Sequence, residues 1–114
     1  MITVLVKFKI SDELNLKTLK EKFIETSVLY VDVEGLLRKN YIADIEKGFA
    51  GGVYTFSTIE NAKEWFSEDR IKWITERYSK PEIEYYESPV IVDNEKNKII
   101  SCLLYTSPSP RDNR

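Results

Sequence analysis

Apolar and polar residues alternate at the start of the chain. In residues 2–10, "ITVLVKFKI", the side chains of Val4, Val6 and Phe8 share one face, whereas Lys7 belongs to the other. A period of two is typical of a β-strand with one buried face. The first element is therefore predicted to be a strand that contributes one apolar face to a core.

The pattern then changes to helical spacing. In the segment "LKTLKEKFIETSVLY", Leu19 and Phe23 lie four residues apart, and either Ile24 or Thr26 continues the same face. Lysines and glutamates fill the positions between them. This spacing predicts an amphipathic helix that packs on the core.

Two alternating segments follow and are joined by a short turn at Gly48. The first, "LLRKNYIADI", covers residues 36–45, and the second, "AGGVYTF", covers residues 50–56. Two strands separated by a short turn that contains glycine are expected to pair as an antiparallel hairpin. Within the first of them, Arg38 belongs to one face and Lys39 to the other.

The last part of the pattern predicts a second helix and a final strand. Ser57 and Glu60 form a capping box, which favours a helix start at this point. The segment "SEDRIKWITERYS" continues or restarts that helix, and Pro81 stops it. The strand "EIEYYESPVIV" follows, with Pro89 interrupting it.

The predicted order is β-α-β-β-α-β, the ferredoxin-like pattern. It corresponds to an α+β fold in which an antiparallel sheet carries both helices on one face. Leu5, Leu36 or Leu37, Tyr54 and Tyr85 suggest apolar content on both faces of this sheet. Because the helices cover only one face, we expect a second copy to cover the other, giving a homodimer.

The end of the chain has no such periodicity. The segment "CLLYTSPSPRD", residues 102–112, resembles the in-frame translation of a transposon-type sequencing adapter; the alternative is a disordered Ser/Pro-rich tail. We therefore expect one domain in residues 1–95, a C-terminal extension in residues 96–101 and a non-native tail in residues 102–114.

Composition narrows the function classes. Lysine and arginine number 17 and aspartate and glutamate 19, and they are interspersed, unlike the basic stripe of a nucleic-acid-binding protein. No apolar run is long enough for a membrane helix, and the N-terminus lacks signal-peptide features, so we expect a cytoplasmic protein without a membrane partner.

The chain has no histidine and one cysteine, which argues against Ser-His-Asp and Cys-His triads, zinc sites and His-ligated haem. We expect neither a metal nor an organic cofactor.

Three segments carry a family resemblance. In order and spacing, "EGLLRKNYI", "AGGVYTFSTIENAKEWF" and "PEIEYYESPVIVDN" resemble the YdhR-type monooxygenases. These belong to the dimeric α+β-barrel superfamily, together with the antibiotic-biosynthesis monooxygenases. The resemblance covers essentially residues 2–94. It implies a ferredoxin-like protomer, a homodimeric α+β barrel, and a pocket between the sheet and the helices.

The resemblance also implies an activity. It is a cofactor-independent monooxygenation of a small aromatic or enolic molecule, in which the deprotonated substrate itself reduces O2. The alternative is a module on the same fold that binds or senses a small molecule without turnover. Haem degradation, a third activity of this fold, is disfavoured because the chain offers no axial histidine.

We expect Arg38, Tyr41 and Tyr54 to carry the chemistry. Arg38 lies mid-strand among apolar residues, so it needs an anionic partner, either the substrate anion or a glutamate at the dimer surface. Tyr41 and Tyr54 lie on neighbouring strands, where they either donate phenolic hydrogens into a pocket or pack in the core. Of Arg38 and Lys39, one is expected to be solvated.

The substrate-binding set is expected to combine one amide, one small residue and several aromatic rings. Its members are Asn40, Gly52, Trp65, Phe66, Trp73 and Tyr85. Each also has a structural interpretation: an edge hydrogen bond for Asn40, a bulge or tight packing for Gly52, core packing for the rings, and a loop or dimer contact for Trp73. An error of one residue in register would exchange the two faces.

Overall fold

A computed structural model describes residues 1–101 and 106–108 of the chain, in which helices lie beside two antiparallel sheets. The first sheet and its helices comprise β1 (Ile2–Lys9), α1 (Leu16–Ser27), the 3-10 helix η1 (Val28–Tyr30), β2 (Leu36–Asp44), β3 (Phe49–Phe56), α2 (Ile59–Trp65), α3 (Glu68–Arg77) and β4 (Glu82–Glu87). The second sheet comprises β5 (Val90–Asp93), β6 (Lys98–Ser101) and β7 (Thr106–Pro108). The expected adapter-derived tail falls largely outside the described residues.

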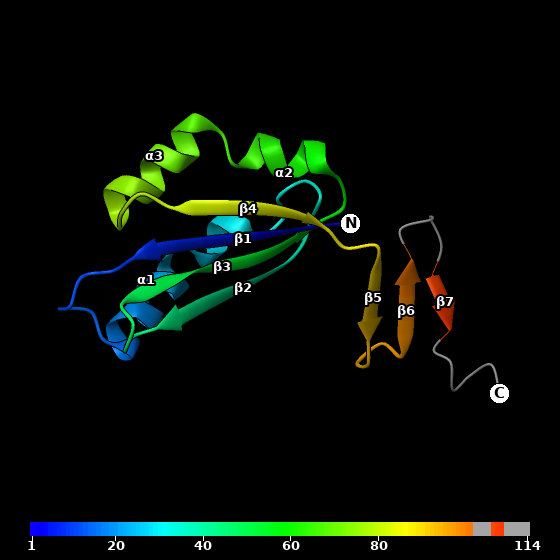
Figure 1. Ribbon diagram of the computed structural model, residues 1–114, viewed down its shortest axis with the longest axis horizontal. Helices are drawn as coiled ribbons and strands as arrows, with labels where there is room; N and C mark the ends of the chain where they lie inside the picture. The colour runs from blue at the N-terminus through cyan, green and yellow to red at the C-terminus, as the bar shows by residue number, and fades with distance from the viewer. Residues whose placement is uncertain (102–105, 109–114) are drawn as a thin grey trace.

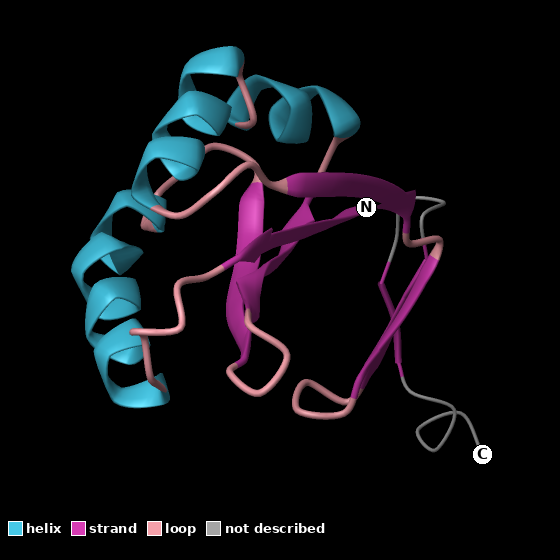
Figure 2. Cartoon of the chain, turned by 60° about the vertical axis from the view of Figure 1, so that its left-hand side comes forward, coloured by secondary structure: helices cyan, strands magenta, loops and turns pink. Residues whose placement is uncertain are grey.

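The first sheet has the strand order β2-β3-β1-β4, and every neighbouring pair is antiparallel. The helices lie on one face of this sheet (Figures 1 and 2). The α+β class is thus confirmed, and the arrangement is consistent with a ferredoxin-like fold in which the second helical region is divided into α2 and α3.

The core lies between the first sheet and its helices. The alternation in β1 is confirmed, because Val4 and Val6 are almost completely buried on the face that meets the helices. From α1, Leu19 and Thr26 are buried, whereas Ile24 remains 60% exposed. Of the two residues considered for this helical face, Thr26 is therefore the one that meets the core.

The second helical region begins one residue later than predicted and is divided into two helices. The predicted capping box at Ser57 is wrong, because Thr58 is the N-cap and its Oγ1 accepts a hydrogen bond from the backbone N–H of Asn61 at 3.1 Å. The helix then stops at Phe66 and restarts, since Ser67 caps α3 through the backbone N–H of Arg70 at 3.2 Å.

The outer face of the first sheet is less apolar than the sequence suggested. Leu36, Tyr54 and Tyr85 all pack on the inner, helix-covered face. On the outer face, Leu5 pairs with Val53 and with Glu84, so apolar and charged side chains are mixed there. The apolar content assigned to both faces is therefore concentrated on one.

The second sheet continues from β4 beyond the end of the first sheet and away from the helices (Figures 1 and 2). Its first two strands form a hairpin in which Val90 pairs with Ser101 and Asp93 with Lys98. The expected boundary between residues 95 and 96 falls in the turn of this hairpin. Among the described residues, no helix is both long enough and apolar enough to cross a membrane.

Candidate functional site

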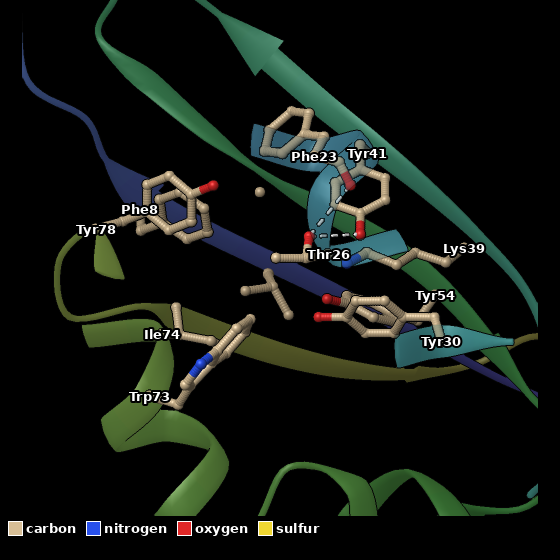
Figure 3. A pocket seen from close by; sticks show the side chains of 12 residues that line it. Phe8, Phe23, Thr26, Tyr30, Lys39, Tyr41, Tyr54, Trp73, Ile74 and Tyr78 are labelled. Atoms are coloured by element: carbon tan, nitrogen blue, oxygen red, sulfur yellow. Dashed lines mark hydrogen bonds between the residues drawn. The ribbon is translucent and has the colours of Figure 1, made fainter. Parts of the chain in front are cut away.

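A small cavity lies between the inner face of the first sheet and the helices, as Figure 3 shows. Its volume is about 20 Å³, close to the space that one water molecule needs. We call it the inner cavity. It is lined by Val6, Phe8, Phe23, Thr26, Tyr30, Lys39, Tyr41, Gly51, Tyr54, Trp73, Ile74 and Tyr78.

Lys39 extends from β2 into this cavity and ends among tyrosine rings. Its Nζ lies 3.4 Å from the ring centroid of Tyr30, 3.7 Å from that of Tyr41 and 4.8 Å from that of Tyr54. We call these three residues the tyrosine cage. Figure 3 shows the amine between Tyr41 on one side and Tyr30 and Tyr54 on the other. A cation at such distances is attracted by the negative ring faces.

No carboxylate in the part of the chain that the structure describes neutralises Lys39. The only ion pair found there joins Arg77 to Glu25, at 3.7 Å. Lysine in a protein interior is normally paired, because the charged form loses its hydration. The tyrosine cage is therefore the environment that replaces a counter-ion.

The β2–β3 register explains why Lys39 points inward. Lys39 pairs with Tyr54 and Tyr41 with Gly52, so these four positions share the inner face. A Cβ atom on Gly52 would lie 3.0 Å from Cε1 of Tyr54 and 3.1 Å from Cε of Lys39. The absence of a side chain at Gly52 thus provides the space that the Lys39 side chain occupies.

Gly51 serves a different purpose. A Cβ atom at this position would overlap the backbone carbonyl oxygen of Val6 on the neighbouring strand. Only glycine permits this close approach of β1 and β3. Of the two sequence-based interpretations, tight packing therefore describes Gly51, whereas Gly52 makes room for a side chain of this chain.

Burial changes the acid–base properties of the cavity. Loss of hydration, and then the positive charge of Arg70, lower the pKa of Lys39 from 10.5 to about 6. The ring faces of the tyrosine cage favour the ammonium form and so act in the opposite direction. Burial also raises the pKa of Tyr41 and of Tyr54, which keeps both phenols protonated as hydrogen-bond donors at neutral pH. Lys39 is thus the group that exchanges a proton most readily near neutrality in this cavity.

Hydroxyl groups from α1 and from the residue that follows α3 complete the polar lining. Thr26 Oγ1 lies 3.2 Å from the backbone oxygen of Phe23, to which it donates, and 3.0 Å from the hydroxyl of Tyr41. Either hydroxyl can be the donor in the second bond, because both groups donate and accept. The buried hydroxyl of Tyr78 has no hydrogen-bond partner among the described residues, so it is available to a guest in the cavity.

Three of the residues predicted for the site meet at the cavity. Tyr41 and Tyr54 line it as part of the tyrosine cage, and Trp73 of α3 lines the opposite wall. Trp73 was the aromatic residue considered for a loop or dimer contact, and its ring instead faces the inner cavity beside Ile74 (Figure 3).

The other predicted aromatic residues surround the cavity without lining it. Trp65 lies with its ring centroid 5.4 Å from that of Tyr30. Phe66 is a buried core residue whose ring meets Tyr54 edge to face at 4.9 Å, and Tyr85 lies beyond it at 6.4 Å. These residues support the tyrosine cage from behind.

Arg38 and Asn40 lie on the opposite, outer face of the first sheet and are exposed. Arg38 pairs with Thr55, and Asn40 with Val53. The expected burial of Arg38 is therefore wrong for the single chain, because the helices cover only the face to which Lys39 and Tyr41 belong.

A groove at the open edge of β2 shares part of its lining with the cavity. It has a volume of about 330 Å³, and Tyr30, Lys39 and Tyr41 line both it and the inner cavity. We call it the edge groove. Its remaining lining residues are Ser27, Val31, Asp32, Leu36, Leu37 and Arg38. Arg38 therefore lines the edge groove but not the inner cavity.

Four polar residues that line the cavity were not predicted from the sequence as members of the site. They are Thr26, Tyr30, Lys39 and Tyr78. The pattern of alternation could have pointed to Lys39, because it places this lysine on the same strand face as Leu37 and Tyr41. No such pattern pointed to Tyr30, because its position depends on the 3-10 turn that follows α1.

Comparison of the chain with protein-family models and with curated proteins finds no match. The resemblance to YdhR-type monooxygenases therefore stays a prediction.

Proposed function

We propose that this protein is a cytoplasmic, cofactor-independent monooxygenase that acts on a small phenolic or enolic molecule, with Lys39 as the general base. The observation that carries the proposal is the half-buried Lys39, whose amine is enclosed by three tyrosine rings and unpaired with any carboxylate of the described residues. A general base is most effective when its pKa lies near the working pH. With no histidine in the chain and a pKa of about 6, Lys39 meets this condition.

The chemistry needs no bound redox group. Lys39 removes a proton from the substrate RH2, and the resulting anion lies beside the new ammonium group. The anion then gives one electron to O2, and the two radicals combine to a peroxide. Protonated by Lys39, the peroxide loses water. The balance is RH2 + O2 → R=O + H2O, in which one oxygen atom enters the product and the other leaves as water.

The edge groove is the proposed substrate site. The inner cavity, about 20 Å³, is too small for an aromatic ring, whereas the edge groove offers about 330 Å³. A flat molecule in this groove reaches Lys39 with its acidic edge, and Arg38 offers its charge to an anionic substituent. Tyr41 and Tyr54 hold the amine in place and line the route for the proton.

The proposal includes a homodimer in which two first sheets pack to form an α+β barrel. What supports it is the outer face, where Leu5 and Val53 pair without a covering helix. In such a dimer the outer-face side chains, among them Arg38 and Asn40, are covered by the second copy. Arg38 then contacts both the dimer interface and the edge groove.

One observation favours a second candidate, a binding module without turnover. Lys39 lines both the edge groove and the inner cavity, and the inner cavity, about 20 Å³, has no room for an organic ligand while the lysine side chain is in place. A ligand that displaces the lysine side chain, without donating a proton to it, would be bound and released unchanged.

Oxygen uptake tests the proposal. The purified chain is treated with EDTA, supplied with dithranol or a methylhydroquinone, and followed with an oxygen electrode against the rate without protein. We expect Lys39→Met to reduce the catalysed rate on the order of a hundredfold, which is a typical contribution of a general base. Lys63→Met is the matched control, because Nζ of Lys63 lies over the single ring of Tyr85 at 4.3 Å, on the protein surface.

An unchanged rate in Lys39→Met would contradict the role of Lys39. Saturable binding of the substrates, with no oxygen uptake by the unmodified chain, would contradict the oxygenase and support the binding module.

A further inference from the structure

We propose that Lys39 is also a covalent site, at which its amine forms an imine with a small aromatic aldehyde that enters through the edge groove. The inference rests on the placement of the amine and does not require the oxygenase activity. Three features combine here: a half-buried lysine without a carboxylate partner among the described residues, a surface groove that this lysine lines, and hydroxyl groups nearby.

The amine is placed for attack on a carbonyl carbon. Lys39 lines both the inner cavity and the edge groove, so a molecule in the groove contacts the side chain that carries the amine without passing through the core. Burial and Arg70 favour the uncharged amine, which is the nucleophilic form. One part of the edge groove wall is apolar or aromatic, with Leu36, Leu37 and Tyr30 among its residues, and this part suits an aromatic ring better than an aliphatic polyol.

The step balances without any other reactant. The nitrogen lone pair forms a bond to the carbonyl carbon, the C=O π pair moves to oxygen, and a proton transfers from nitrogen to that oxygen, giving a carbinolamine. The hydroxyl group then takes up a proton and leaves as water while the C=N bond forms. One aldehyde and one amine therefore give one imine and one water, and hydrolysis reverses the step.

The tyrosine cage stabilises the product as well as the free amine. The imine is cationic when protonated, and its nitrogen occupies the place of Nζ, 3.4 Å from the centroid of Tyr30 and 3.7 Å from that of Tyr41. Ring faces attract an iminium as they attract an ammonium group. No other lysine of the described residues lies over three rings: Lys7 lies over Phe49 alone, and Lys63 over Tyr85 alone.

Reductive trapping tests the inference. The full chain is incubated at pH 7 with benzaldehyde and sodium cyanoborohydride, which reduces an imine to a stable secondary amine. Intact mass and peptide mapping then report how many benzyl groups were added and where. We expect the first benzyl group on Lys39, at a rate at least on the order of ten times that at Lys7 or Lys63, with the α-amine of Met1 scored separately.

Two variants keep the test decisive. Lys39→Arg retains a cation in the tyrosine cage but cannot form an imine, so we expect it to lose the fast adduct while its circular dichroism stays unchanged. Lys63→Arg should retain the fast adduct. Equal modification of the exposed lysines with Lys39 unmodified, or an undiminished fast phase in Lys39→Arg, would overturn the inference.

The outcomes also separate the two proposals. Fast trapping at Lys39 without oxygen uptake supports the covalent site and contradicts the oxygenase. Oxygen uptake without trapping at Lys39 contradicts the covalent site and leaves the oxygenase in place.

Discussion

The amine of Lys39 is subject to two opposing influences. Burial and Arg70 lower its pKa to about 6, whereas the ring faces of Tyr30 and Tyr41 favour its charged form. A surface lysine experiences neither influence to this extent. The alternating pattern placed this side chain on the face opposite Arg38 and expected one of the two residues to be solvated. In the structure it is the cavity group whose pKa lies near neutrality.

This environment makes stability depend on pH. The folded pKa of Lys39, about 6, lies below its ordinary value of 10.5, so between these values the unfolded chain binds more protons than the folded one. The free energy of unfolding consequently rises with pH across this window, by up to about 1.4 kcal/mol per pH unit, and the full penalty of the buried charge applies below it. Lys39→Met removes this contribution.

Urea unfolding at several pH values measures the effect. We expect Lys39→Met to be more stable than the unmodified chain at pH 6.5, with a difference that narrows by at least about 1 kcal/mol by pH 8.5. Lys63→Met controls for the loss of a surface charge. A difference for Lys39→Met that stays constant with pH would show that the amine is not titrating in this window.

At the scale of elements, the β2–β3 hairpin builds the site. Cross-strand pairing sets Lys39 opposite Tyr54 and Tyr41 opposite Gly52 on one face of the sheet. The turn that joins the strands has Gly48 at φ 75°, a left-handed conformation that suits glycine. Hairpin and turn together fix which side chains of β2 enter the inner cavity.

Gly52→Ala tests this arrangement. Its new Cβ would press on Cε of Lys39 at 3.1 Å and Cε1 of Tyr54 at 3.0 Å, so we expect a loss of about 1–3 kcal/mol in unfolding free energy. We also expect Lys39 to move toward the edge groove, which returns its pKa toward the ordinary value and shifts benzaldehyde trapping to higher pH.

Gly48→Ala is the matched control, because nothing lies within 4 Å of its Cβ and only its left-handed backbone is strained, at about 1 kcal/mol. The pH dependence of trapping should be unchanged in this variant. An identical pH dependence in Gly52→Ala would contradict the proposed contact between Gly52 and Lys39.

Periodicity predicted the elements well and their ends less well. The alternation in β1 was sufficient because one face of that strand is buried along its whole length. Ser57 and Thr58 are both good N-caps, and the choice between them depends on backbone angles that the sequence does not express. Similarly, Ile24 and Thr26 both fit the spacing of α1, and only the rotation of the helix against β2 brings Thr26 to Tyr41.

The candidate site was predictable only in part, for a related reason. The sequence assigned Arg38 and Lys39 correctly to opposite faces of β2, but it could not say which face the helices cover. Tyr41 and Tyr54 were predicted because they lie on strands. Tyr30 and Tyr78 lie at a 3-10 turn and a helix end, where no period specifies the direction of a side chain.

At the scale of the whole molecule, we expect the chain to assemble as a homodimer. The chain has a mass of 13.4 kDa, and we expect native mass spectrometry to find twice that mass, because the outer face of the first sheet has no helices over it. Val53→Glu places a charge next to Leu5 on this face and should yield a monomer with unchanged circular dichroism. A monomer in the unmodified chain would contradict the proposed α+β barrel.

The two tryptophans of the chain both lie near Lys39, and this has a practical consequence. Trp73 lines the inner cavity, Trp65 contacts Tyr30, and the guanidinium of Arg70 lies 4.0 Å from the ring centroid of Trp65 and 5.4 Å from that of Trp73. Indole emission responds to nearby charges and to water. The intrinsic fluorescence of this protein therefore originates almost wholly beside the candidate site, which gives it a built-in optical signal for ligand titrations without any label.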